Sequence, residues 1–188
     1  DWTILEGSIG TVDIAGATDN FALAGTDARL IRLADAADAS VTLTGALAVL
    51  QAGQWTGGAI EAASINTLTA AGDFGASMTV AGTLANARIG GAVTAGVWTV
   101  GGLGVLNVAS VDGWTLDLGG AAMRTLILGD ATDTSVTAGS LGVVRANTWL
   151  GGTLTADSIG AAVIAGDFSA AMALDNPGAQ ALRSLTVG

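Results

Sequence analysis

Repeated aspartates are the residues of this chain that could carry out chemistry. Three of them recur in the second half of the chain, as Asp35 with Asp130, Asp38 with Asp133, and Asp73 with Asp167. Paired carboxylates can act as acid and base in polysaccharide cleavage, and carboxylate oxygens are the preferred ligands of Ca²⁺. All of these residues fall at expected corners of the chain rather than together on a strand face.

The chain lacks the residue types that usually act as general acid or base beside catalytic carboxylates. The chain has no His, Cys, Tyr or Lys, so no imidazole, amine, phenol or thiolate stands beside the carboxylates. The sequence therefore predicts turn and solvation roles for the aspartates, no enzyme activity, no cofactor, and no catalytic, cofactor-binding or metal-binding residues. A stabilising Ca²⁺ site is the alternative, with Asp19, Asp35 and Asp38 at one corner. However, the nonapeptide GGxGxDxxx of calcium-binding β-rolls is absent.

Aromatic and hydroxyl side chains offer two further kinds of binding surface. Trp55 recurs as Trp149, and Trp2 and Trp98 occupy inward strand positions, so core or corner packing is favoured over a sugar-stacking platform. Serines and threonines alternate along the outward side of several expected strands and resemble the Thr-x-Thr faces of ice-binding solenoids. A packing surface between neighbouring rods would account for the same array. Its members are Ser40, Thr42, Thr44, Ser77, Thr79, Ser135, Thr137, Thr153 and Thr155, interrupted by Glu61 and Asp117.

Charge and hydropathy exclude other classes. The chain carries 16 acids and 6 arginines, a net charge of −10, and no run of sequence gathers the arginines into a basic stripe. This argues against nucleic acid as a partner. No uninterrupted apolar run approaches the roughly 18 residues that a membrane-spanning helix requires.

A tandem duplication organises the whole sequence. SINTLTAAGDFGASM at residues 64–78 returns as SIGAAVIAGDFSAAM at residues 158–172, 94 positions later. We therefore predict one continuous domain over residues 1–188, with a first superrepeat of about residues 1–94 and a second of about residues 95–188.

A finer cycle of about 19 residues lies inside each superrepeat. Successive cycles open on Ile9, Ala28, Leu47, Ile65, Leu84, Leu103, Met123, Leu141, Ile159 and Leu182. Apolar residues three and five positions later alternate with other residues, which is the period of a strand with one buried face. A second alternating pair follows in each cycle: Phe21/Leu23, Val41/Leu43, Ile60/Ala62, Met78/Val80, Trp98/Val100, Leu116/Leu118, Val136/Ala138, Leu154/Ala156 and Met172/Leu174.

Short strands at fixed offsets, joined at Gly and Asp corners, predict an all-β parallel solenoid of about ten coils, with five coils in each superrepeat. At about 4.8 Å per coil the rod would be roughly 48 Å long. Phrases such as Gly152-Thr153-Leu154-Thr155-Ala156 resemble the repeats of filamentous haemagglutinin-type bacterial surface proteins and adhesins. The resemblance implies a right-handed parallel β-helix on a secreted or cell-surface protein, although the many Asn residues of those families are missing.

The two ends fit the same period. Asp1-Trp2-Thr3-Ile4 already follows the repeat, so no targeting segment is visible, and joining Gly188 to Asp1 would preserve the spacing of the cycles. We expect further units or other copies to stack on the ends. The expected role is a structural or adhesive rod, extracellular or on the bacterial surface, that self-associates end to end or laterally and contacts cell surfaces or polysaccharide. A carbohydrate- or ice-binding module using the Thr/Ser face is the alternative.

Overall fold

Apolar side chains at every second position build the strands of this protein, because such a segment buries one face and exposes the other. The computed structural model describes residues 2–5, 7–94, 96–175 and 180–188, which form strands and turns without helix. The strands are β1 (Trp2–Leu5), β2 (Ser8–Asp19), β3 (Phe21–Gly25), β4 (Asp27–Ala37), β5 (Ser40–Leu43), β6 (Ala46–Thr56), β7 (Ala59–Ala62), β8 (Ser64–Ala70), β9 (Ser77–Thr94), β10 (Val97–Asp112), β11 (Thr115–Asp117), β12 (Met123–Ile164), β13 (Ala171–Leu174) and β14 (Leu182–Val187).

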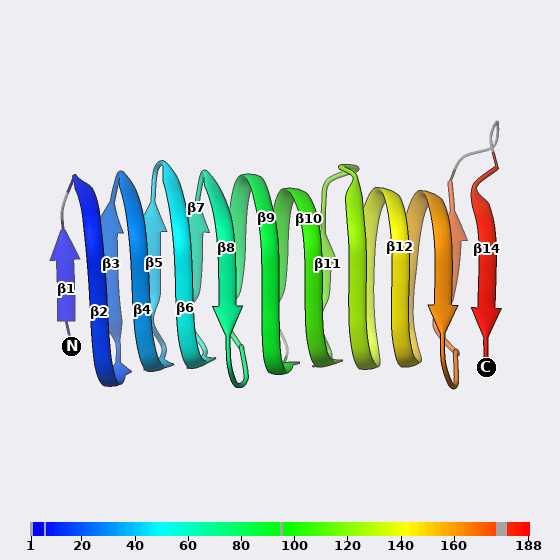
Figure 1. Cartoon of the computed structure of the whole chain (residues 1–188), viewed down its shortest axis with the longest axis horizontal. Coiled ribbons are helices and arrows are strands. Elements are labelled where there is room, and N and C mark those ends of the chain that lie inside the picture. Colours follow the sequence, from blue (N-terminus) through cyan, green and yellow to red (C-terminus); the bar gives the residue numbers. More distant parts are fainter. Residues whose placement is uncertain (1, 6, 95, 176–179) are drawn as a thin grey trace.

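All strand pairings are parallel, and each joins segments one coil apart. A short-strand ladder runs through β1, β3, β5, β7, β9, β10, β11, β12 and β13, and a long-strand ladder runs through β2, β4, β6, β8, β9, β10, β12 and β14. The chain makes about nine turns of about 19 residues. The nearer strands in Figure 1 run downward and the farther strands upward as the chain advances from left to right, which is a right-handed coil. The predicted parallel β-solenoid is confirmed.

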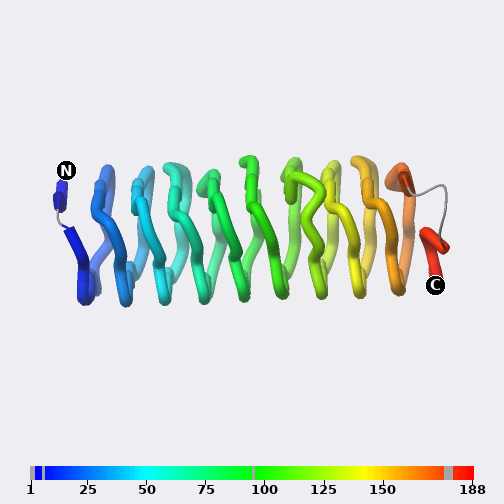
Figure 2. The backbone as a smooth tube through the Cα atoms, turned by 90° about the horizontal axis from the view of Figure 1, so that it is seen from above, coloured from blue at the N-terminus to red at the C-terminus, as the bar shows by residue number. Residues whose placement is uncertain are grey.

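The long-strand ladder follows the predicted cycle openers. Ile9 pairs with Ala28, Ala28 with Leu47, and the column continues through Ile65, Leu84 and Leu103 to Met123. All of these side chains are buried. Figure 2 shows the resulting stack of evenly spaced coils from above. The aliphatic columns therefore lie directly over one another, as the period predicted.

One predicted column is displaced by two residues in the first coils. Leu23, not Phe21, pairs with Val41, while Phe21 pairs with Trp2 and Leu23 with Ile4. Ile4, rather than Trp2, therefore stands in the column that reaches Trp98. Phe21 and Leu23 both point inward and are 1% and 2% exposed. The sequence pattern could not separate positions two apart on the same face of a strand, because both satisfy the alternation.

A further inward column lies at the corner after each long strand. Core or corner packing was predicted for Trp55 and Trp149, but the column itself was not. It contains Ala36, Trp55, Phe74, Val93, Val111, Ala131, Trp149 and Phe168. Trp98 and Trp114 stand outside this column but pack against it, so that rings contact one another through successive coils. The ring centroids are 5.9 Å apart for Trp55 and Phe74, 5.5 Å for Phe74 and Trp98, and 5.1 Å for Trp98 and Trp114. Trp149 and Phe168 pack in the second superrepeat at 6.4 Å. The Trp55–Phe74 pair is tilted and the other three are edge-to-face, and such contacts add to the stabilisation from burial.

Replacing Leu106 with Asp is expected to destabilise the rod severely. Leu106 is fully buried in the long-strand column, so the substitution puts an unpaired carboxylate into apolar surroundings, at a cost of about 4 kcal/mol or more. The matched control is Asn107→Asp at the next, outward position, where we expect a change within about 0.5 kcal/mol. Circular dichroism melting measures both, and equal melting of Leu106→Asp and the parent would place Leu106 outside the core.

Candidate functional site

The corner aspartates occupy left-handed turn positions. Asp38 and Asp133 have φ values of 50° and 47°, and Asn20 in the preceding coil has 52°. Glycine holds the same corner in other coils, with φ of 81° at Gly57 and 74° at Gly151. Asn, Asp and Gly are the residues that adopt this conformation at least cost. The turn role predicted for Asp38 and Asp133 thus has a backbone cause.

The carboxylates of Asp38 and Asp133 also leave no room for a side chain at the corner position of the next coil. A Cβ atom on Gly57 would lie 2.3 Å from Oδ1 of Asp38, and one on Gly151 would lie 2.4 Å from Oδ1 of Asp133. Each aspartate therefore packs over a glycine of the following coil. The pairing recurs in the second superrepeat, 95 residues later for the aspartate and 94 residues later for the glycine.

Other aspartates accept hydrogen bonds from the adjacent coil. Oδ1 of Asp73 accepts from the backbone N of Ala92 at 2.8 Å, and Oδ1 of Asp27 accepts from the backbone N of Ala46 at 2.7 Å. Such bonds satisfy amide groups that the strand ladder leaves unpaired at the corners. These carboxylates connect coils and do not converge on a common point.

The alternative calcium corner is not assembled. Asp19 pairs with Ala37, one residue before Asp38, and Asp35 pairs with Ala17 and Gln54. Across the part of the chain that the structure describes, no three acidic side chains come together in a group that could hold a metal ion. The three aspartates lie at different registers of the ladder.

The tryptophans fill the interior. Trp55, Trp98, Trp114 and Trp149 are all 0% exposed. Nε1 of Trp98 donates to the carbonyl oxygen of Ala76 at 3.1 Å. A sugar-stacking platform needs an exposed indole face, so that alternative is wrong for these four residues. The side chain of Trp2 lies outside the described residues.

Hydroxyl residues do form ranks on the outward face of the short-strand ladder. One column pairs Ser40 with Ala59 and Ala59 with Ser77, and later Val97 with Thr115 and Thr115 with Ser135. The neighbouring column runs Thr42, Glu61, Thr79, Thr99, Asp117 and Thr137. The array is thus longer than the sequence suggested, because Thr99 and Thr115 complete it between the two superrepeats. Val97, 51% exposed, adds an apolar side chain to the first column.

All six arginines lie on one side of the rod, although no run of sequence gathers them. All six are exposed and project from the outward side of the long-strand ladder: Arg29, Arg32, Arg88, Arg124, Arg145 and Arg183. They are far apart in the sequence, but the coil spacing returns each to the same side of the rod. We call this side the arginine face.

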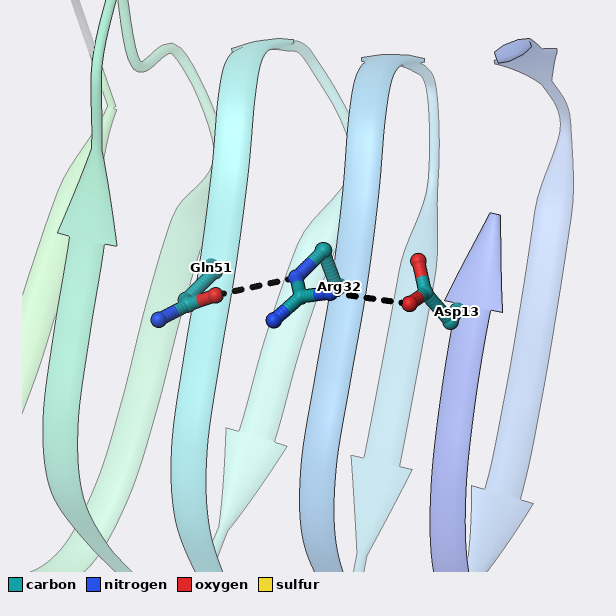
Figure 3. A network of polar contacts seen from close by, with 3 residues as sticks. All are labelled: Asp13, Arg32 and Gln51. Carbon is teal, nitrogen blue, oxygen red and sulfur yellow. Dashed lines mark hydrogen bonds and ion pairs between the residues drawn. The ribbon is translucent and has the colours of Figure 1, made fainter. Parts of the chain in front are cut away.

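Arg32 shows how side chains on this face connect coils. Figure 3 shows it between Asp13 and Gln51, its ladder neighbours on either side. Nη1 of Arg32 lies 2.9 Å from Oδ2 of Asp13, and Nε donates to Oε1 of Gln51 at 3.1 Å. Both side chains of the ion pair are about half exposed, so the pair contributes at most about 1 kcal/mol.

Comparisons with known proteins do not assign the chain to a family: no family model, curated protein or solved structure gives a significant match. Within residues 2–5, 7–94, 96–175 and 180–188, no helix is long and apolar enough to span a membrane.

Substitutions of Asp38 separate a turn role from a metal role. Asp38→Gly should stay within about 0.5 kcal/mol of the parent, because Gly adopts the left-handed conformation freely, whereas Asp38→Ala should lose about 1 kcal/mol. Urea denaturation with Ca²⁺ or with a chelator measures both variants. Stabilisation of the parent by Ca²⁺ that is lost in Asp38→Gly would contradict the turn assignment.

Proposed function

We propose that this chain is a structural or adhesive repeat segment: a rigid rod that forms part of a filament, stalk or surface layer. The observation that supports the proposal is the unbroken stack of buried aliphatic side chains, from Ile9 in β2 to Ile164 at the end of β12. Nearly all of the large apolar side chains are buried between successive coils. The interior of the rod, over the residues that the structure describes, is therefore filled by side chains and does not form a catalytic cavity.

The mechanism of such a segment is mechanical. Each coil buries its inward columns and hydrogen-bonds to the coils on both sides, so stability is a sum of similar nearest-neighbour terms. Length then scales with the number of coils while the cross-section stays constant. A bacterial surface or extracellular location is inferred from the resemblance to haemagglutinin-type repeats.

Further layers on the ends would extend the rod. In β14, Leu185 and Val187 continue the inward columns yet are 44% and 46% exposed. In β1, Ile4 pairs with the buried Leu23 yet is itself only partly buried. Apolar side chains beside an unpaired strand edge favour the addition of another strand. We therefore propose stacking of a further unit or of another copy on these layers.

Val187→Asp is expected to weaken such end-to-end association, because it places a charge in the contact between layers. Val163→Asp is the matched control: Val163 is 40% exposed but lies on the side of the rod. Sedimentation velocity over a range of protein concentrations should show the parent and Val163→Asp forming larger species and Val187→Asp remaining small. A parent that stays monomeric at all concentrations would remove self-stacking from the proposal.

The ordered hydroxyl columns favour a second candidate, an ice- or carbohydrate-binding face. Thermal hysteresis of ice growth and a glycan array test it directly. Thr137→Glu interrupts a column of this face, whereas Thr69→Glu puts the same charge on the arginine face, where Thr69 pairs with Gln51 and Arg88. If the face binds, Thr137→Glu should abolish the activity and Thr69→Glu should retain it. An inactive parent in both assays would eliminate this candidate.

A further inference from the structure

A groove runs along the arginine face, parallel to the axis of the rod. It consists of three hollows of about 210, 480 and 530 Å³ that share lining residues. Thr83 and Ala85 line the first and second hollows, and Ser140 and Gly142 line the second and third. From Ser64 to Arg183 the groove crosses seven coils, or about 29 Å at about 4.8 Å per coil.

Glycines create the depth of the groove. A Cβ atom on Gly104 would lie 2.3 Å from the carbonyl oxygen of Ala85, and one on Gly142 or Gly160 would lie 2.5 Å from the carbonyl oxygen of the coil before it. The backbone approach thus excludes any side chain at these positions. Because these glycines carry no side chains, an open channel remains between the side chains on either side of them.

The groove is positively charged although the protein as a whole is acidic. Arg124 and Arg183 line it, Arg88 and Arg145 project from the same face, and all four are exposed. The long-strand segments at residues 64–70, 83–90, 102–109, 122–129, 140–147, 158–165 and 182–187 contain no acid, and the acids next to them in the sequence are Asp130, directly after residue 129, and Asp157, directly before Ser158. Among the described residues the one ion pair is that of Arg32 with Asp13, which leaves the groove arginines without carboxylate partners.

We propose that this groove binds a linear polysaccharide that carries carboxylate groups. Guanidinium groups recognise carboxylates through paired hydrogen bonds. Ser64, Thr83, Ser140 and Ser158 line the groove with hydroxyls that suit the hydroxyl groups of sugars. An open groove that crosses seven coils fits an extended polymer better than a small molecule. The inference goes beyond the rod role, because the groove lies on the side of the molecule and not at its ends.

Nucleic acid is the less favoured anionic polymer. Binding of single strands relies on aromatic side chains that stack on bases. The exposed large apolar side chains in the described part of the chain are Leu or Val, and none is aromatic.

Biolayer interferometry with immobilised polygalacturonate tests the assignment at low salt and pH 7. The parent should bind, with affinity that falls as salt rises, and should not bind neutral dextran. Arg124→Gln should weaken binding roughly two- to fivefold, the range expected for loss of one exposed charge contact. Ser140→Leu should also weaken it, because the added side chain narrows the groove where two hollows meet.

Arg29→Gln is the matched control. Arg29 is exposed on the same face but lines none of the three hollows, so the same loss of charge should leave the affinity within about twofold of the parent. Thermal melting establishes that all variants fold. Failure of the parent to bind polygalacturonate, or equal losses for Arg29→Gln and Arg124→Gln, would overturn the proposal. Tighter binding of single-stranded DNA than of polygalacturonate would assign the groove to nucleic acid instead.

Discussion

Hydrogen bonding between parallel strands one coil apart is the constraint on which the other features depend. Because pairing is parallel and each coil has nearly the same length, equivalent residues of successive coils must lie over one another. A column then tolerates only one kind of environment along the rod. Buried columns hold aliphatic or aromatic side chains, and left-handed corners hold Asn, Asp or Gly. Gly stands at single positions where the backbone of the preceding coil comes too close for a Cβ atom.

The same stacking gives each side of the rod its own chemistry. Hydroxyls gather on the outward face of the short-strand ladder, arginines on the outward face of the long-strand ladder, and several aspartates at the corners. Charge segregation of this kind lets a protein of net charge −10 present a local positive surface. The overall charge is therefore a poor guide to what each side of the molecule contacts.

The sequence predicted the repeat, the parallel solenoid and the long-strand column, because few folds other than a solenoid return an aliphatic residue to the same environment every 19 residues. It misplaced Phe21 relative to Val41, since alternation alone does not distinguish inward positions two residues apart. Core or corner packing of Trp55 and Trp149 was predicted and is confirmed. The continuous corner column that also holds Phe74 was not predicted, because Ala36, Val93 and Ala131 dilute its aromatic signal.

The arginine face was missed for a different reason. Arg88, Arg124 and Arg145 do not cluster along the sequence, because one or two coils separate them. They come to lie on one side of the rod only when the chain folds into coils. Aligning the arginines on the cycle openers would have found them, because every one stands one or four positions after an opener. The groove itself depends on backbone approach at Gly104, Gly142 and Gly160, which spacing alone does not reveal.

The aromatic stack from Trp55 to Trp114 gives the rod an uneven distribution of local stability. Interlocked rings join consecutive coils in the middle of the molecule, whereas Ile14 in the first long strand is only partly buried and Leu185 in β14 is exposed. In a linear array each coil gains stability only from its neighbours. Opening should therefore start at the two extremities and proceed inward, so that backbone amides near the stack exchange their hydrogens with solvent last.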